Sequence, residues 1–322
     1  MKIIGWHIPE QPGQIHDMIA RVKDLGFDSY EVTTNLPEKE TPLKESCVRF
    51  GLKTFKVIEP LKKRPGAVMQ VLEESEEALP RSFEDAPDYQ GGEAPLPGQR
   101  EILHAKLACP QDPGVIEYAR SQVKQAKSFG HDGVCWDFIG YRNYRSCRCA
   151  LCSAALKRTA TGDINKQAME DAFFEQNIVS LYDSLYEATK TMTPAMRIIC
   201  HCYPVFLPNP LYGLRINVDY CGITVSWFLK PHWPIEKVET LVNKTVHGPY
   251  THAHVAGMPM IGFYGTGDLQ QHYRTPERIA QELDLLKAHG AQALMMCETG
   301  NILGCPEVAE TIGKSSLWPK LI

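Results

Sequence analysis

The side chains in this sequence that could perform chemistry include a carboxylate placed inside a short apolar segment. Residues 133–139 (GVCWDFI) are typical of a buried strand, and Asp137 lies near the end of that segment. A buried carboxylate without a partner is costly, so an acid at this position indicates a specific role. The alternative is that Asp137 pairs with Arg142 or Arg145 and only shapes the loop that follows.

A second carboxylate, Glu298, ends another apolar segment, residues 293–298 (ALMMCE). Acid–base cleavage of a glycosidic bond requires two carboxyl groups that flank the bond. One of them must stay protonated near neutral pH, which burial or a neighbouring anion can achieve. We therefore predict Asp137 and Glu298 as the catalytic pair, with Glu59 and Asp268 as alternatives for the second acid.

Three thiols follow Asp137 at a spacing that suits metal binding. Cys147, Cys149 and Cys152 can converge on one ion, and Cys109, which precedes the helix leading to residues 133–139, is the predicted fourth ligand. Four thiolates form a closed, tetrahedral zinc site of the structural kind. The prediction is a structural zinc ion that holds the loop after Asp137, and the alternative is a set of free thiols or one labile disulfide.

The composition restricts the classes of protein that remain. The chain has 322 residues, 43% hydrophobic and 22% charged, with a net charge of -4, which gives no reason to expect nucleic acid as a partner. No apolar segment approaches the roughly 20 residues of a membrane span, and the N-terminal apolar run is too short for a signal peptide, so we expect a cytoplasmic protein without a membrane partner. Eleven cysteines are an odd number, and we interpret Cys135, Cys200, Cys221 and Cys297 as reduced core residues.

The elements that must position these side chains alternate along the chain. Strands are predicted over 2–7, 29–33, 52–58, 133–139, 197–202, 220–228, 260–264 and 293–298. Helices are predicted over 15–25, 42–50, 112–129, 165–191, 234–246, 275–288 and 305–315. Eight strands alternating with helices, without a dinucleotide-binding fingerprint or a P-loop, favour an α/β fold of the (β/α)8 TIM-barrel type. We predict one domain over 1–322 with a long insertion, rich in proline, glycine and acidic residues, over 59–109.

The predicted strand ends carry aromatic and polar side chains that suit a neutral polyol. Aromatic faces pack against the C–H faces of a sugar, while imidazole, amide and carboxylate groups bind its hydroxyls. Each residue alone could be a core residue, but their recurrence at successive strand ends predicts a carbohydrate partner, a small molecule or an oligosaccharide. The predicted substrate-binding residues are Trp6, His7, Asn35, Glu59, His201, Tyr203, Trp227 and Tyr264.

Residues 112–141 resemble the helix-plus-strand signature of glycoside-hydrolase-like barrels, in which N-P-x-V-x-x-Y leads to D-G-I-x-x-D-x-I-R-Y. The matching residues here are Pro113, Val115, Tyr118, Asp132, Gly133, Asp137 and Tyr141. Some members continue into C-x-C-x-x-C and carry a cysteine before the helix, as this chain does at Cys147, Cys149, Cys152 and Cys109. The resemblance is close over 109–152 and implies a catalytic acid at Asp137. Tyr141 joins the predicted substrate-binding residues. The resemblance does not fix the second acid, because the fifth predicted strand ends without one.

Three functions remain open from the sequence. The first is a glycoside hydrolase with a structural zinc ion. The second is a metal-dependent sugar isomerase or epimerase with Glu31, His201 and Glu298 as ligands. The third is a non-catalytic sugar-binding barrel. The oligomeric state is open, with a homo-oligomer as one outcome.

Overall fold

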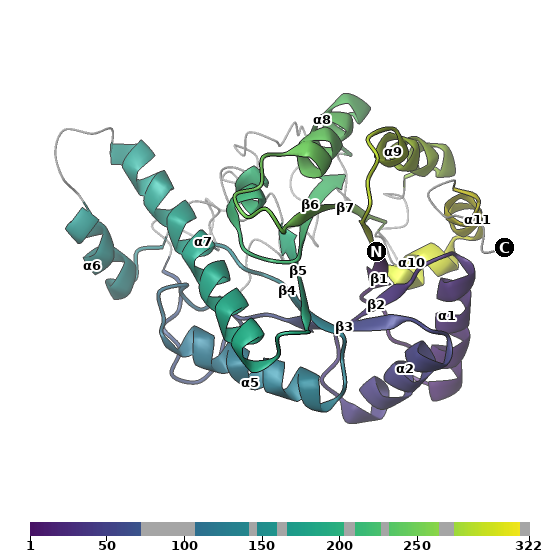
Figure 1. Ribbon diagram of the computed structural model, residues 1–322, viewed down its shortest axis with the longest axis horizontal. Helices are drawn as coiled ribbons and strands as arrows, with labels where there is room; N and C mark the ends of the chain where they lie inside the picture. The colour runs from purple at the N-terminus through teal and green to yellow at the C-terminus, as the bar shows by residue number, and fades with distance from the viewer. Residues whose placement is uncertain are drawn as a thin grey trace.

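The computed structural model describes residues 1–71, 107–141, 147–159, 166–202, 210–226, 232–263 and 274–315. In these residues eight parallel strands close into a barrel in chain order, and β8 pairs with β1. Figure 1 shows the strands at the centre of the molecule. The strands are β1 (Lys2–Gly5), β2 (Ser29–Val32), β3 (Lys53–Ile58), β4 (Gly133–Trp136), β5 (Arg197–Cys202), β6 (Tyr220–Ser226), β7 (Ala256–Gly262) and β8 (Leu294–Cys297). The predicted (β/α)8 TIM barrel is confirmed.

Helices surround this barrel, and α6 lies beyond α7 at one side of the molecule (Figure 1). They are α1 (Pro12–Asp24), α2 (Pro37–Arg49), α5 (Gly114–Ser128), α6 (Ala150–Thr159), α7 (Lys166–Met192), the 3-10 helix η3 (Pro210–Arg215), α8 (Ile235–His247), α9 (Pro276–Ala288), α10 (Thr299–Gly304) and α11 (Pro306–Lys314). Among the described residues, no helix combines the length and the apolar character needed to cross a bilayer.

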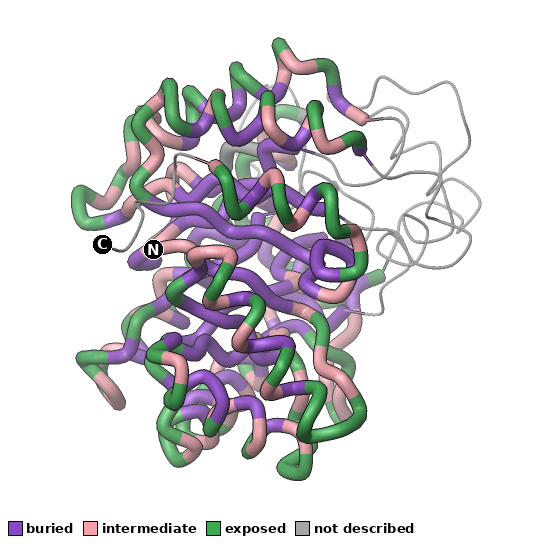
Figure 2. The backbone as a smooth tube through the Cα atoms, turned by 90° about the vertical axis from the view of Figure 1, so that its right-hand side faces the viewer, coloured by how far each residue is buried: buried purple, intermediate pink, exposed green. Residues whose placement is uncertain are grey.

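The strands are buried on both faces, as their apolar sequences predict for a parallel sheet covered by helices. In β2, β4 and β8 every residue is buried. Figure 2 shows the buried segments in purple inside the molecule, with exposed segments in green around them. On β2 the hydroxyl of Tyr30 reaches Met18 of α1, so Tyr30 faces the helices. Since successive side chains in a strand alternate between faces, Glu31 faces the barrel interior.

Several element boundaries differ from those predicted. Helix α2 begins at Pro37 instead of residue 42, because Pro37 occupies the first turn and Pro42 lies within the helix. Strand β7 begins at Ala256 instead of residue 260, although Gly257 and Pro259 are residues that usually interrupt strands. Helix α9 begins as predicted, with the Thr275 hydroxyl accepting a hydrogen bond from the Arg278 N–H.

The two ends of the predicted insertion over 59–109 lie against each other. Isolated antiparallel bridges pair Lys62 with Leu107 and Met69 with Ala108. The part over 72–106 lies outside the described residues. The division of the chain into one domain with one insertion stays a prediction.

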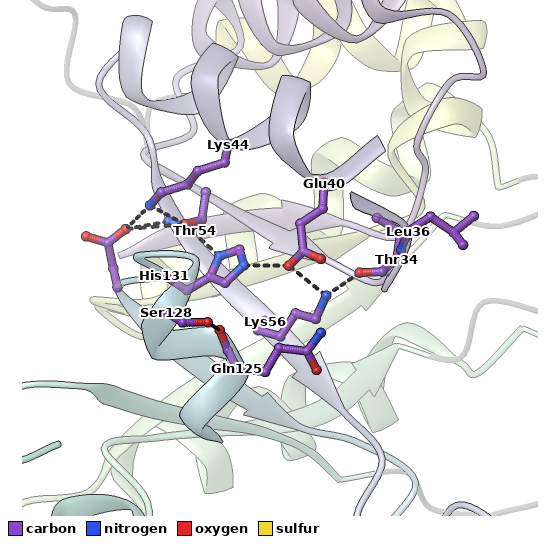
Figure 3. Close-up of polar contacts among 10 residues, drawn as sticks. Thr34, Leu36, Glu40, Lys44, Thr54, Lys56, Gln125, Ser128 and His131 are labelled. Atoms are coloured by element: carbon purple, nitrogen blue, oxygen red, sulfur yellow. Dashed lines mark hydrogen bonds and ion pairs between the residues drawn. The ribbon is translucent and has the colours of Figure 1, made fainter. Parts of the chain in front are cut away.

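A buried polar network lies between α2 and the outer face of the barrel (Figure 3). Glu40 of α2 accepts hydrogen bonds at 2.8 Å from both Lys56 and His131. Lys56 also donates to the carbonyl of Thr34, and Nδ1 of His131 lies 3.0 Å from the hydroxyl of Thr54. Burial opposes the charge on Glu40, but the hydrogen bonds from His131 and Lys56 outweigh burial and lower its pKa. The network therefore connects the segment after β2 with β3, α2 and the turn before β4.

Candidate active site and cysteine cluster

Three ionisable side chains meet inside the barrel near the ends of β2, β4 and β5. Nε2 of His201 lies 2.9 Å from Oε1 of Glu31, and Nδ1 of His201 lies 3.2 Å from Oδ1 of Asp137. All three residues are buried. The imidazole therefore links two carboxylates that come from different strands.

The charge of this group follows from its surroundings. Burial opposes protonation of His201, but the adjacent carboxylates of Glu31 and Asp137 outweigh burial and raise its pKa from 6.5 to about 10. At neutral pH His201 is thus an imidazolium. Its two ring nitrogens therefore form ion pairs with Glu31 and with Asp137.

Trp6 covers one side of this group. It follows β1 directly, and its φ of 83° lies in the left-handed region, which is unusual for a residue with a side chain. Its indole N–H donates to Oε2 of Glu31 at 3.0 Å, and its ring centroid lies 5.4 Å from that of His201. Backbone strain at a strand end, with an aromatic ring held over a charged group, is typical of a functional site.

Glu59 is a second carboxyl group near Asp137, and its pKa is shifted by its surroundings. It is the first residue after β3 and is half-buried. Burial, followed by the negative charge of Asp137, raises the pKa of Glu59. The site thus places, near Asp137, a second carboxyl group whose own pKa is raised.

Glu298, the predicted partner of Asp137, caps a helix. Its Oε1 accepts a hydrogen bond from the Gly300 N–H and its Oε2 accepts one from the Asn301 N–H, each at 3.0 Å. The side-chain amide of Asn301 also donates to Oε2, and Nδ1 of His7 lies 3.5 Å from Oε1. These bonds satisfy the exposed N–H groups at the start of α10. They engage both carboxylate oxygens of Glu298 in capping, and its catalytic role stays a prediction.

The other predicted substrate-binding residues lie in different surroundings. His7 and Asn35 are exposed, whereas Tyr141 is fully buried and its hydroxyl accepts a hydrogen bond from the Asn177 amide at 3.1 Å. Tyr203, Trp227 and Tyr264 lie outside the described residues, as do Arg142, Arg145 and Asp268. A substrate-binding role for any of them stays a prediction.

Glu31 was considered only as a metal ligand of the isomerase alternative, yet it lies at the centre of this group. The signal was present, because Glu31 is an acid within the apolar segment Ser29–Val32, just as Asp137 follows the buried β4. Cys135, interpreted as a core thiol, lies with its Sγ 3.2 Å from Nε2 of His201.

The four predicted zinc ligands are brought together as expected from their spacing. The sulfur atoms of Cys109, Cys147, Cys149 and Cys152 all lie within 4.8 Å of one another, and all four residues are buried. Sγ of Cys109 lies 3.3 Å from that of Cys152 and 3.5 Å from that of Cys149. Such a donor set fits a structural zinc ion.

Backbone N–H groups surround this four-cysteine cluster. Gln111 donates to the sulfur of Cys109 and Val71 to that of Cys147, each at 3.4 Å, and the Cys152 N–H donates to Cys149 at 3.5 Å. Hydrogen bonds from Cys109 and Cys152 lower the pKa of Cys147. These donors stabilise negative charge on sulfur, as the outer contacts of metal sites do.

No model of a protein family matches this sequence, and no curated protein is similar to it. The fold, however, is similar to that of solved glycoside hydrolases. A β-galactosidase from Halorubrum lacusprofundi is 11% identical with a TM-score of 0.62, over 99% of this chain and 59% of that chain. The glycoside hydrolase domain of PgaB (BpsB) from Bordetella bronchiseptica is 12% identical with a TM-score of 0.56, over 97% of both chains.

An α-L-fucosidase isoenzyme 2 from Paenibacillus thiaminolyticus is 13% identical with a TM-score of 0.55, over 98% of this chain and 48% of that chain. This chain therefore spans about half the length of that fucosidase. At these identities the likeness establishes a shared fold and nothing about the substrate.

Proposed function

We propose that this protein is a glycoside hydrolase in which Asp137 and Glu59 are the two catalytic carboxyl groups. The observation that carries the proposal is the position of Asp137, held by His201 at 3.2 Å, next to Glu59, whose pKa is raised. Glycosidases need one carboxylate and one protonated carboxyl group, with environments that separate their pKa values. The fold shared with solved glycosidases agrees with this function.

In this mechanism each group has one task. Glu59 delivers its proton to the glycosidic oxygen as the bond to the anomeric carbon breaks. Asp137 either bonds to the anomeric carbon, forming a glycosyl-enzyme that water then cleaves while Glu59 takes the proton of that water, or takes a proton from the water that attacks the anomeric carbon. His201 and Glu31 touch neither atom in this scheme and position Asp137.

The test is hydrolysis of a panel of aryl glycosides, beginning with α-L-fucosides and β-D-galactosides, by the wild type and by Asp137→Asn. Loss of acid–base or nucleophilic chemistry should lower kcat/KM by about 10²–10⁴-fold. Asp17→Asn, at an exposed carboxylate on α1, is the matched control and should leave kcat/KM unchanged. Unchanged hydrolysis by Asp137→Asn would contradict the assignment. Carbohydrate binding without turnover in the wild type would favour a non-catalytic sugar-binding barrel.

A metal-dependent sugar isomerase or epimerase is the second candidate, and one observation favours it. Ligand atoms of Glu31, Cys135 and His201 lie within 4.8 Å of one another, so they could hold an ion in the barrel interior. Turnover that is lost with EDTA while the circular dichroism is retained, and that returns with added Mn²⁺, would favour this reading. Hydrolysis insensitive to EDTA would exclude it.

We also propose that Cys109, Cys147, Cys149 and Cys152 hold a structural zinc ion, which supplies no chemistry to the substrate. The four thiolates would join the end of the insertion, the loop after β4 and α6. Zinc content measured by mass spectrometry should fall by one equivalent in Cys149→Ala and stay unchanged in Cys47→Ala, a buried thiol of α2 outside the cluster. A zinc content unaffected by Cys149→Ala would refute the site.

A further inference from the structure

A second group of thiols lies on the outer face of the barrel, away from the four-cysteine cluster. Cys200 and Cys202 project from β5 and Cys221 from β6, and all three are buried. The sequence indicated isolated core thiols at Cys200 and Cys221, but the fold brings three sulfur atoms together. Sγ of Cys200 lies 3.7 Å from that of Cys202 and 3.9 Å from that of Cys221, and the Cys202–Cys221 distance is 3.9 Å.

This triangle matches the geometry of three ligands around one ion. Thiolates about 2.3 Å from a tetrahedral zinc ion lie about 3.8 Å apart. The arrangement is fixed by the barrel, because Cys200 and Cys221 are directly paired across β5 and β6. Cys202 lies on the same face of β5, two residues further on.

A glycine covers two of the sulfur atoms. A Cβ at Gly213 of η3 would lie 2.8 Å from Sγ of Cys221 and 3.1 Å from Sγ of Cys202. Sγ of Cys221 donates to the carbonyl of Gly213 at 3.3 Å. The backbone of η3 can therefore approach the thiols only because this residue has no side chain.

We propose that Cys200, Cys202 and Cys221 form a second metal site, which binds a soft divalent cation such as Zn²⁺ through three thiolates. Thiolate donors select soft ions. A divalent ion leaves one surplus negative charge and a monovalent ion leaves two, and buried surplus charge is costly, so the divalent ion is favoured. This site is separate from the proposed hydrolytic site and from the four-cysteine cluster.

The position of the site gives it a structural task. His201 lies between Cys200 and Cys202 on β5, and its side chain points to the opposite face, into the barrel. An ion held by both cysteines would fix the β5 backbone on either side of His201. The second metal site thus supports the group that positions Asp137.

The test is the zinc content of the full chain purified from zinc-supplemented cells, because the thiols are buried and an ion would enter during folding. Cys221→Ala should contain one equivalent of zinc less than Cys47→Ala. This difference is independent of whether the four-cysteine cluster is filled, and independent of the hydrolytic activity. Gly213→Ala, which keeps all three thiols but crowds two of them, should show the same loss.

A crystal structure of the wild type provides a readout without substitution, should Cys221→Ala fail to fold. An anomalous peak at the zinc edge between the three sulfur atoms is expected. Equal zinc content in Cys221→Ala and Cys47→Ala, or folded wild-type crystals without that peak, would overturn the proposal.

Discussion

The most informative residue of the candidate site is His201, because it connects Glu31 and Asp137 and carries charge at neutral pH. A buried imidazolium between two carboxylates fixes both of them, because its removal would leave two buried carboxylates without their ion-pair partner. Glu59 lies outside this chain of ion pairs and retains the raised pKa that an acid catalyst requires.

We predict that Glu59→Gln removes the basic limb of the pH–activity profile. The raised pKa of Glu59 means that activity requiring its proton is present below that pKa and is lost as the pH rises through it. The variant should lose about 10²–10⁴-fold in kcat/KM on glycosides with poor leaving groups and much less on activated aryl glycosides. Glu38→Gln, at an exposed position of α2, serves as control. An unaltered basic limb would assign the proton to another group.

A second prediction concerns stability. The pKa of His201 is about 10 in the folded protein and near 6.5 in an unfolded chain, so the folded state holds the proton more tightly. Its contribution to the free energy of unfolding is complete below about pH 6.5 and disappears as the pH rises towards about 10. Denaturant titrations should therefore show the difference between wild type and His201→Gln shrinking over this range. A difference independent of pH would show that His201 is not charged.

Among the elements, the short helix α10 follows the last strand, β8, and has Glu298 as its N-cap. It has only six residues, so the hydrogen bonds at its N-cap contribute a large part of its stability. Glu298 supplies them with both carboxylate oxygens. Glu298 was also predicted to be catalytic. A capping role and a catalytic role would give different effects when Glu298 is replaced.

If Glu298 is chiefly a cap, Glu298→Ala should lower the free energy of unfolding by about 1–2 kcal/mol, as loss of a helix cap does. Glu298→Gln, which keeps one acceptor oxygen, should lose less stability and retain hydrolysis. Thermal unfolding together with kcat/KM distinguishes the roles. Activity lost in Glu298→Gln with stability intact would restore Glu298 as a catalytic residue.

The elements also show how far the sequence could predict the structure. Strands were predictable because β4 and β8 are short, wholly apolar segments followed by acids. Helix α6 and η3 were not predicted, because α6 begins within the cysteine loop and η3 begins at a proline among residues without apolar periodicity.

Within the site, Asp137 and His201 were identified from single strands. The central role of Glu31 and the convergence of Cys200 with Cys221 depend on contacts between residues far apart in the sequence. No local pattern specifies such contacts.

At the scale of the whole molecule, closure of the barrel brings β1 against both β2 and β8. Gly5 ends β1 and is paired with Glu31, and a Cβ at Gly5 would collide with the Cβ of Glu31. The interior of the barrel has room for the Glu31 carboxylate because its neighbour has no side chain.

Gly5→Ala should therefore destabilise the protein by about 1–3 kcal/mol, as overpacking of a core does, and should lower hydrolysis by displacing Glu31. Gly13→Ala is the control, since nothing lies within 4 Å of the added Cβ and the residue is inside α1. That change should leave stability unchanged or raise it by up to about 1 kcal/mol. Chemical denaturation of both variants provides the comparison, and equal stabilities would contradict the tight packing of β1 on β2.

The network around Lys56 has a practical consequence. Its ammonium group is enclosed by Glu40 and the carbonyl of Thr34, whereas Lys63 is exposed. An acylating reagent added to the native protein would modify Lys63 readily and reach Lys56 only when α2 separates from the barrel. The fraction of acylated Lys56, measured by peptide mapping, would therefore report how often α2 separates from the barrel when no denaturant is present.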